Sequence, residues 1–204
     1  MKNKVIIKKP SVIEVKKYLK KWNSLEDYFQ QERALNKLFL EIYSKNNQIE
    51  DVLIKVCALN QFYSTNIRRI FDIANHITNL KIDKDLEENN FDIVEKIAKG
   101  HEIRVKKSNK ELYLYSFATK YCSHHKPENF PIYDFYVEKI LKYFRDSDNF
   151  DSFSDGDLKN YPLFRETILH FIKFYNLKMF NIKQIDQYLW ILGKEHFLKK
   201  YKRY

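Results

Sequence analysis

Apolar residues recur at intervals of three and four along almost the whole chain, and sustained alternation of polar and apolar residues is nearly absent. The first spacing places apolar side chains on one face of an α-helix, whereas alternation would place them on one face of a strand. The sequence therefore predicts an all-α fold of about nine to ten helices. A length of 204 residues suits a single compact unit, residues 1–204, built from two closely packed helical lobes.

Cap and turn residues divide this pattern into segments. Ser11 predicts the N-cap of the first helix, and Ser24 with Asp27 predicts a capping box for the second. Gly100 predicts the end of a helix that begins near Asn90. Further helices are expected over residues 49–59, 65–80 and 110–124, from residue 134 onward, and over residues 163–174 and 185–192, with a connection at 146–157.

The chain is strongly basic, with a net charge of +10 and a pI near 9.3. Such a charge favours a polyanionic partner, because each neutralised phosphate releases a counterion. An anionic membrane surface would also attract it, but nucleic acid is the favoured partner. No apolar run reaches membrane-spanning or signal-peptide length, so we expect a cytoplasmic monomer that does not bind membranes. Cys57 and Cys122 are expected to be buried thiols.

The segment Phe130–Leu141 carries the candidate catalytic residue. Pro131 gives a non-helical entry, and Asp134 follows where a carboxylate meets the unpaired N–H groups at the start of a helix. A carboxylate held there tends to stay ionised. The simpler alternative is that Asp134 only caps the helix.

These residues resemble the helix-hairpin-helix DNA glycosylase superfamily, above all the mismatched-adenine glycosylases and their endonuclease III-like relatives. The family's catalytic aspartate lies in a segment of the form F-P-I-L-D-x-x-V-x-R-x-L, and residues 130–141 match nearly every position. Ser116, 18 residues before Asp134, falls where lyase-type members carry a Schiff-base lysine. The stretch 58–65 resembles the family's L-S-x-Q-x-T segment, which implies that Gln61, or Asn60 beside it, probes the DNA duplex.

The resemblance implies a glycosylase-like helical core at residues 48–146 and a second lobe formed by residues 1–47 and 157–204. The family's glycine-rich hairpin would lie at residues 100–122, but this stretch has no glycine after Gly100. Contacts with the DNA backbone in this stretch would instead depend on positively charged side chains. The candidates are Arg104, Lys106, Lys107 and Lys110. The four cysteines of the family's iron–sulfur motif are also missing, so no cofactor is expected.

The resemblance also implies an activity, the excision of a damaged, mismatched or modified base from double-stranded DNA. Asp134 would stabilise a sugar with oxocarbenium character while the base departs. The base must first leave the stack, and the candidate walls of its pocket are Tyr133, Tyr136 and Phe62, although aromatic residues are often only core residues. Ser116 has no amine for a Schiff base, which favours hydrolysis without strand cleavage.

Two other residue groups have competing interpretations. Lys120 lies one helical turn beyond Ser116 and is either a nucleophile or phosphate contact, or an ordinary surface lysine. Cys122, His124 and His125 are residue types that bind zinc, but their spacing supplies no fourth ligand, so we expect no metal site.

Alternative functions follow from the missing glycine hairpin and from the charge. The first is a catalytically inactive DNA-binding or protein-interaction module on the same fold, serving DNA repair or defence against phage. The second is a basic protein that binds an acidic partner or an anionic membrane.

Overall fold

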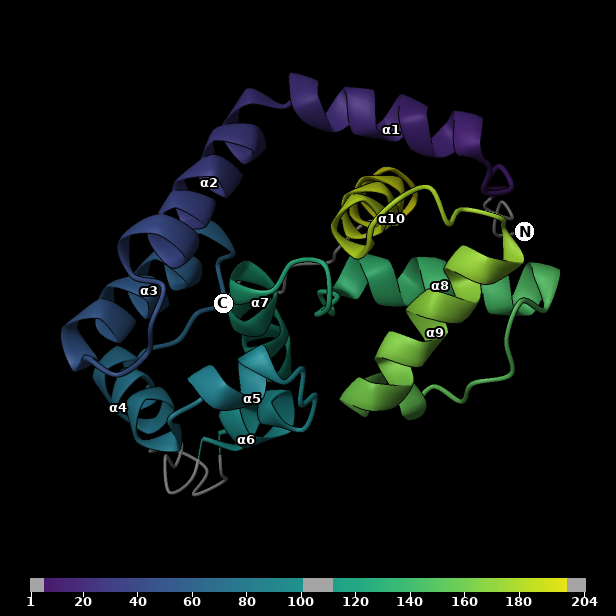
Figure 1. Ribbon diagram of the computed structural model, residues 1–204. Helices are drawn as coiled ribbons and strands as arrows, with labels where there is room; N and C mark the ends of the chain where they lie inside the picture. Colours follow the sequence, from purple (N-terminus) through teal and green to yellow (C-terminus); the bar gives the residue numbers. More distant parts are fainter. Residues whose placement is uncertain (1–5, 101–111, 198–204) are drawn as a thin grey trace, which may run out of the picture.

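The structure is a computed structural model that describes residues 6–100 and 112–197. These residues form ten α-helices and contain no β-strand, which confirms the predicted all-α fold (Figure 1). None of these helices has the length and apolar character needed to cross a membrane. In chain order the elements are α1 (Val12–Ser24), α2 (Glu26–Asn36), the π-helix η1 (Lys37–Ile42), α3 (Ile49–Phe62), α4 (Ile70–Leu80), α5 (Asp83–Glu87), α6 (Ile93–Lys99), α7 (Tyr115–His125), α8 (Phe135–Asp148), the 3₁₀-helix η2 (Asp157–Lys159), α9 (Tyr161–Phe174) and α10 (Ile182–His196).

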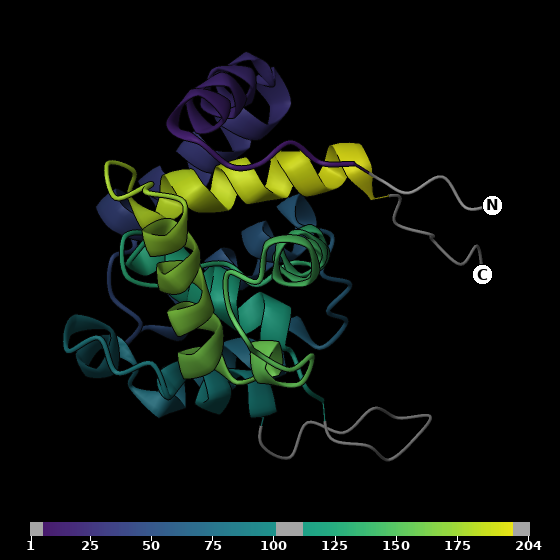
Figure 2. The same cartoon turned by 90° about the vertical axis from the view of Figure 1, so that its right-hand side faces the viewer.

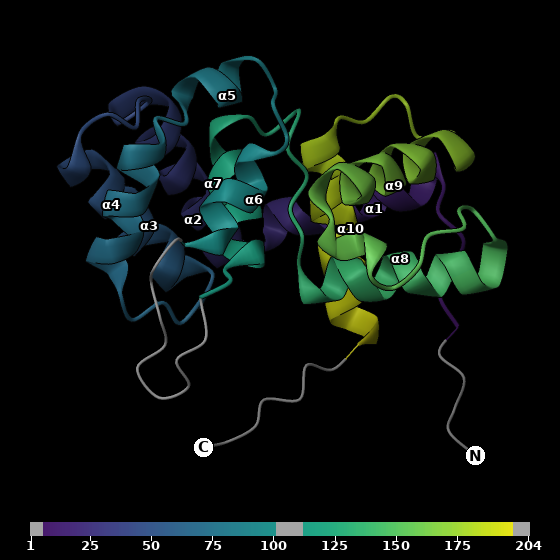
Figure 3. The same ribbon diagram turned by 90° about the horizontal axis from the view of Figure 1, so that it is seen from below.

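The helices form two groups that lie side by side (Figure 3). One lobe contains α2 to α7, with α3 against α4 and α6 against α7; the other contains α1 and α8 to α10, with α10 in contact with both α1 and α8. Figure 2 shows α1 crossing over α10. Two of the expected lobe assignments therefore change, because α8 packs on α10 rather than on the first lobe, and η1 packs on α7 rather than on the second lobe. Helix α2 contacts both α1 and α3 and so joins the two groups.

Helix ends follow the cap residues at most of the predicted places. The Ser11 hydroxyl accepts a hydrogen bond from the Glu14 N–H at 3.3 Å, and Gly100 ends α6 with a φ of 45°. The capping box expected from Ser24 and Asp27 does not form at the start of α2, because the N-cap of this helix is Leu25. The Ser24 hydroxyl instead donates to the Lys21 carbonyl at 2.7 Å.

The turn between α3 and α4 delays the start of α4 to Ile70, later than predicted. Ser64 and Asn66 adopt left-handed backbone conformations, with φ values of 48° and 57°. The Asn60 side chain holds this turn, since its Oδ1 accepts from the Ile67 N–H at 2.8 Å and its Nδ2 donates to the Ile67 carbonyl at 3.0 Å. Asn60 is therefore occupied within the turn, whereas Gln61 beside it is exposed.

The first lobe contains a buried lysine that no periodicity predicted. Lys55 is fully buried in α3, and its ammonium group donates to the Lys45 carbonyl at 2.8 Å and to Asn46 Oδ1 at 2.7 Å. These bonds attach the segment after η1 to α3. The expectation for the cysteines was half wrong, because Cys122 is buried and Cys57 is exposed on the outer side of α3.

Candidate functional site

A cavity of about 410 Å³ lies between the two lobes. Its walls come from both sides of the molecule, and it falls within the size range of small-molecule sites. The lining residues are Trp22, Tyr28, Gln31, Glu32, Leu35, Phe62, Tyr63, Ser64, Asn66, Lys120, Ile132, Asp134, Tyr136, Val137, Lys183, Asp186, Gln187 and Trp190.

Asp134 lines this cavity and also caps α8. Its Oδ1 accepts a hydrogen bond from the Tyr136 N–H at 2.9 Å, while its Oδ2 lies 3.9 Å from the Lys120 ammonium nitrogen. The side chain retains 18% of its exposure. Capping and a place in the cavity are therefore not alternatives for this residue: the cap fixes one oxygen and leaves the other beside an amine.

Lys120 is buried, so the interpretation as a solvated surface lysine is wrong. Almost every side chain of α7 is buried, because this helix packs against α3, α6 and η1 and lies next to the second lobe (Figure 1). The Lys120 Nζ donates to the Ser116 hydroxyl at 2.6 Å, and that hydroxyl donates to the Tyr133 carbonyl at 3.0 Å. Ser116 thus lies behind the amine and positions it.

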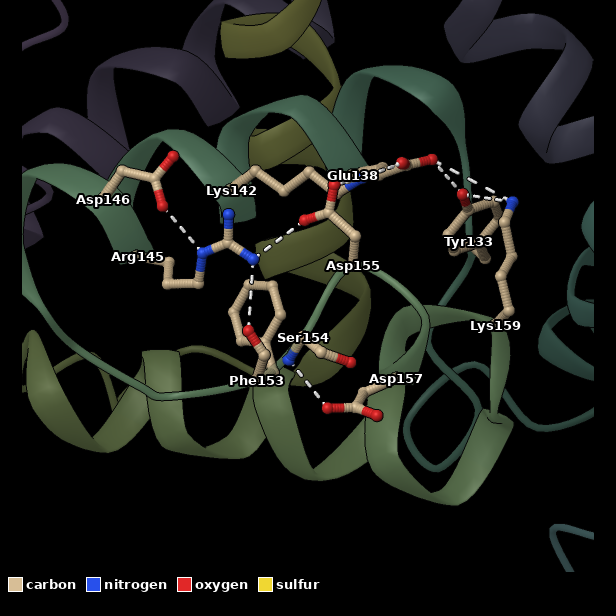
Figure 4. A network of polar contacts seen from close by, with 10 residues as sticks. All are labelled: Tyr133, Glu138, Lys142, Arg145, Asp146, Phe153, Ser154, Asp155, Asp157 and Lys159. Carbon is tan, nitrogen blue, oxygen red and sulfur yellow. Dashed lines mark hydrogen bonds and ion pairs between the residues drawn. The ribbon is translucent and has the colours of Figure 1, made fainter.

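Tyr133 does not line the cavity, and its interpretation as a stacking wall is wrong. The backbone at Asp134 is extended, so neighbouring side chains point to opposite sides. Figure 4 shows the Tyr133 hydroxyl bonded to Glu138 and to the Lys159 ammonium group, the latter at 2.5 Å. In the same network Lys142 contacts Glu138 at 2.5 Å and Asp155 at 3.1 Å.

Aromatic side chains form much of the cavity wall. Tyr136 and Phe62, both predicted from the sequence, line it together with Trp22, Tyr28 and Trp190. The Tyr28 and Trp190 rings meet edge to face with centroids 5.0 Å apart, and the Tyr136 and Trp190 centroids are 6.1 Å apart. Both tryptophans of the chain lie here. Flat apolar walls of this kind suit a planar ligand.

Charged side chains from α2 and α10 form a polar region of the cavity. Glu32 accepts from the Trp22 indole N–H at 3.1 Å and from the Gln187 amide at 2.7 Å, and it pairs with Lys183 at 2.5 Å. Asp186 accepts from the Ile132 N–H at 2.9 Å through Oδ2, whereas its Oδ1 is buried without a hydrogen-bond partner among the described residues. Burial raises the pKa of the Asp186 carboxyl to about 7.

The raised pKa of Asp186 predicts a dependence of stability on pH. Between about pH 4 and 7 the folded state holds a proton that the unfolded state releases, so Asp186 lowers wild-type stability as pH rises. We expect the stability of Asp186→Asn relative to wild type to increase by about 2–3 kcal/mol from pH 5 to pH 8 in urea unfolding. The exposed control Asp27→Asn should show no such change; a constant difference for Asp186→Asn would contradict the expectation.

The candidate zinc residues are engaged in other contacts. His124 Nε2 lies 2.9 Å from the Tyr63 hydroxyl, and His125 Nε2 lies 3.2 Å from Asn46 Oδ1. Burial holds the pKa of both imidazoles well below the usual range and raises the pKa of the Cys122 thiol. Within residues 6–100 and 112–197, no three His, Cys, Asp or Glu side chains are grouped to hold a metal ion.

The basic residues predicted to contact the DNA backbone cannot be placed against this site. Arg104, Lys106, Lys107 and Lys110 lie outside the described residues. Lys194 of α10 is a described cation close to the cavity. Its ammonium group lies over the rings of Tyr28 and Trp190, 4.3 and 4.8 Å from their centroids.

Comparison with known proteins identifies the family. Residues 14–129 match the model of the HI_0787_N family, which is described as an N-terminal domain. The chain belongs to the HI_0787_N family. A relative from Haemophilus influenzae, named only as an uncharacterized protein, is 46% identical over 152 residues, which cover 74% of this chain and 70% of the relative. No solved structure matches the chain.

The HI_0787_N match covers the first lobe and Lys120 but ends before Asp134. The cavity therefore combines residues of the HI_0787_N domain, such as Glu32 and Tyr63, with residues that follow it. Sequence reasoning missed Glu32, Lys183 and Asp186 because they lie far from Asp134 along the chain. A compositional signal was present, since the only two tryptophans belong to the site.

Proposed function

We propose that this protein binds double-stranded DNA, receives an extruded base in the cavity between its lobes, and hydrolyses the N-glycosidic bond of that base with Asp134. The observation that carries the proposal is the position of Asp134, an N-cap carboxylate beside Lys120 in a cavity with aromatic walls. The helix-hairpin-helix glycosylase resemblance of residues 130–141 supports the same assignment.

The shape and lining of the cavity support an extruded base as its occupant. A base that leaves the DNA stack loses its two stacking neighbours and its pairing partner. A protein that holds the base replaces the stacking with aromatic or apolar side chains and the pairing with hydrogen bonds. Tyr136, Phe62 and Trp190 offer aromatic faces, while Glu32, Lys183 and Asp186 offer polar groups for the base edge.

The proposed reaction breaks the bond between C1′ of the sugar and a ring nitrogen of the base. The bonding electron pair leaves with the base, and positive charge develops on the sugar. The Asp134 carboxylate stabilises this charge electrostatically and orients a water molecule for addition to C1′. The water proton is released and the departing base gains a proton, so the products are the free base and an abasic site.

Ser116 and Lys120 support hydrolysis as the main reaction. The Ser116 hydroxyl is bonded to Lys120 and to the Tyr133 carbonyl, and it carries no amine. The Lys120 Nζ donates to the Ser116 hydroxyl and pairs with Asp134, which suits the role of a fixed cation that keeps the carboxylate in place. Borohydride trapping of a Lys120 adduct on abasic DNA would instead assign this amine the role of nucleophile.

Binding to DNA should depend steeply on salt. If about five phosphates are neutralised, a plot of log affinity against log salt concentration has a slope of roughly −4 to −5. Fluorescence anisotropy with a labelled duplex measures this slope when the salt concentration is varied about sixfold, from 50 to 300 mM. A flat response would argue against a nucleic-acid partner.

A screen for base release tests the proposed activity. Wild-type protein is incubated with duplexes that each carry one damaged, mismatched or modified base, and abasic sites are revealed by alkali. Release of a base from one or a few of these duplexes supports the proposal. Binding of duplex DNA without release from any of them favours the inactive DNA-binding module, and absence of binding overturns both.

A further inference from the structure

Tyr63 is a cavity residue whose hydroxyl contacts a buried histidine, His124. It lies at the C-terminal end of α3 and lines the cavity. The Lys120 ammonium group lies over its ring, 5.2 Å from the centroid. Four charged groups of the cavity act electrostatically on its hydroxyl: Lys183, Glu32, Asp186 and Asp134. All four of these charged residues line the same cavity as Tyr63.

His124 decides the direction of the hydrogen bond at this hydroxyl. Burial, with added repulsion from Lys183, holds the pKa of His124 well below the usual range, so its ring is neutral and carries one N–H. Nε2 lies 2.9 Å from the Tyr63 oxygen, whereas Nδ1 is buried and has no hydrogen-bond partner among the described residues.

The two tautomers of His124 differ in cost. With the proton on Nδ1, a buried N–H donor would have no acceptor, which is rare in folded proteins. With the proton on Nε2, the ring donates to the Tyr63 oxygen, and only a lone pair is left unpaired at Nδ1. The second arrangement is favoured, and it makes Tyr63 an acceptor toward His124.

The Tyr63 proton is then available for another acceptor. Burial raises the pKa of Tyr63 to about 12, so the hydroxyl keeps its proton at neutral pH. His124 is the hydrogen-bonding partner of this hydroxyl within the described part of the chain. Because Tyr63 lines the cavity, an acceptor supplied by a ligand can take the free O–H.

We infer that Tyr63 donates a hydrogen bond to a ring nitrogen or carbonyl oxygen of the base held in the cavity, and that His124 is its positioning residue. The inference rests on the proposed function for the identity of the ligand as a nucleobase. The ligand class it selects is an aromatic heterocycle with an acceptor on its edge. During base release the same bond would stabilise the electron pair that departs with the base.

Two small probes test the donor directly. Indole and 7-azaindole have the same bicyclic shape, but 7-azaindole has one ring nitrogen that accepts a hydrogen bond. NMR titration of wild type should show about three- to tenfold tighter binding of 7-azaindole, the effect of one hydrogen bond. Tyr63→Phe should bind both probes alike, and the control Tyr175→Phe, which loses a hydroxyl bonded to Asp148 away from the cavity, should keep the preference. Failure of wild type to bind or to distinguish the probes, or an unchanged preference in Tyr63→Phe, would overturn the inference.

The role of His124 has its own spectroscopic signature. The ¹⁵N chemical shifts of its imidazole should show a protonated Nε2 and an unprotonated Nδ1, and a proton on Nδ1 would overturn the assignment. The outcomes also separate this inference from the proposed function. A wild type that prefers 7-azaindole but releases no base from any duplex would refute the glycosylase activity and leave Tyr63 as the donor. Base release at equal rates by wild type and Tyr63→Phe would refute the donor and leave the activity.

Discussion

Asp134→Asn is expected to lower the rate of base release by about a hundredfold to a thousandfold, the usual cost of removing one electrostatic group from a reacting centre. The asparagine keeps the size of the side chain but has no negative charge to stabilise the developing oxocarbenium ion. Single-turnover release from the best duplex of the lesion screen, with protein in excess, measures the chemical step directly.

The same variant should keep its fold and its affinity for DNA. Asparagine is as good an N-cap as aspartate, so the bond from the Tyr136 N–H can be retained. Thermal unfolding and duplex affinity should therefore be close to those of wild type. Asp27→Asn is the matched control, since it removes one carboxylate from an exposed first turn of α2. Equal rates for Asp134→Asn and wild type would show that Asp134 is only a cap.

The fold class was predictable because helical periodicity is a local property that each segment carries by itself. The errors lie where another interaction decides. The start of α4 was placed too early because the left-handed Ser64 and Asn66, held by Asn60, form a turn that no apolar pattern marks. The five-residue helix α5 was missed because Asp83–Glu87 is too short for a periodic signal. The burial of Lys120 was not predicted, because burial on all sides of α7 depends on how the lobe packs.

The candidate site was only partly predictable for a related reason. Asp134 was found because Pro131 and the apolar periodicity that follows mark the start of a helix, and because residues 130–141 resemble the glycosylase segment. The sequence could not show that Tyr133 points away from the cavity, since this depends on the extended backbone at the cap. Nor could it bring Glu32 and Asp186 together, because the two lobes that carry them meet only in the folded chain.

Gly193→Ala is expected to lower the free energy of unfolding by about 3 kcal/mol, the upper end of the usual cost of overpacking. Gly193 lies in α10 where this helix crosses α8. A Cβ at this position would lie 2.6 Å from the Tyr136 Cβ and 2.7 Å from the Tyr136 carbonyl oxygen. One of these atoms belongs to the backbone, so a change of rotamer cannot relieve the clash and the two helices must move apart.

The clash should also reach the cavity, since Tyr136 of α8 and Trp190 of α10 are two of its walls. Alanine stabilises a helix by about 1 kcal/mol relative to glycine. The loss of stability measured in urea unfolding is therefore the cost of the clash minus this gain. Gly156→Ala is the matched control, because its Cβ would meet only the Ser154 hydroxyl oxygen at 3.8 Å, an ordinary contact, and its φ of −73° suits alanine. We expect that control to be neutral or slightly stabilising. A neutral effect of Gly193→Ala on stability, together with unchanged 7-azaindole binding, would contradict this expectation. It would show that the close crossing of α8 and α10 does not fix the distance between Tyr136 and Trp190.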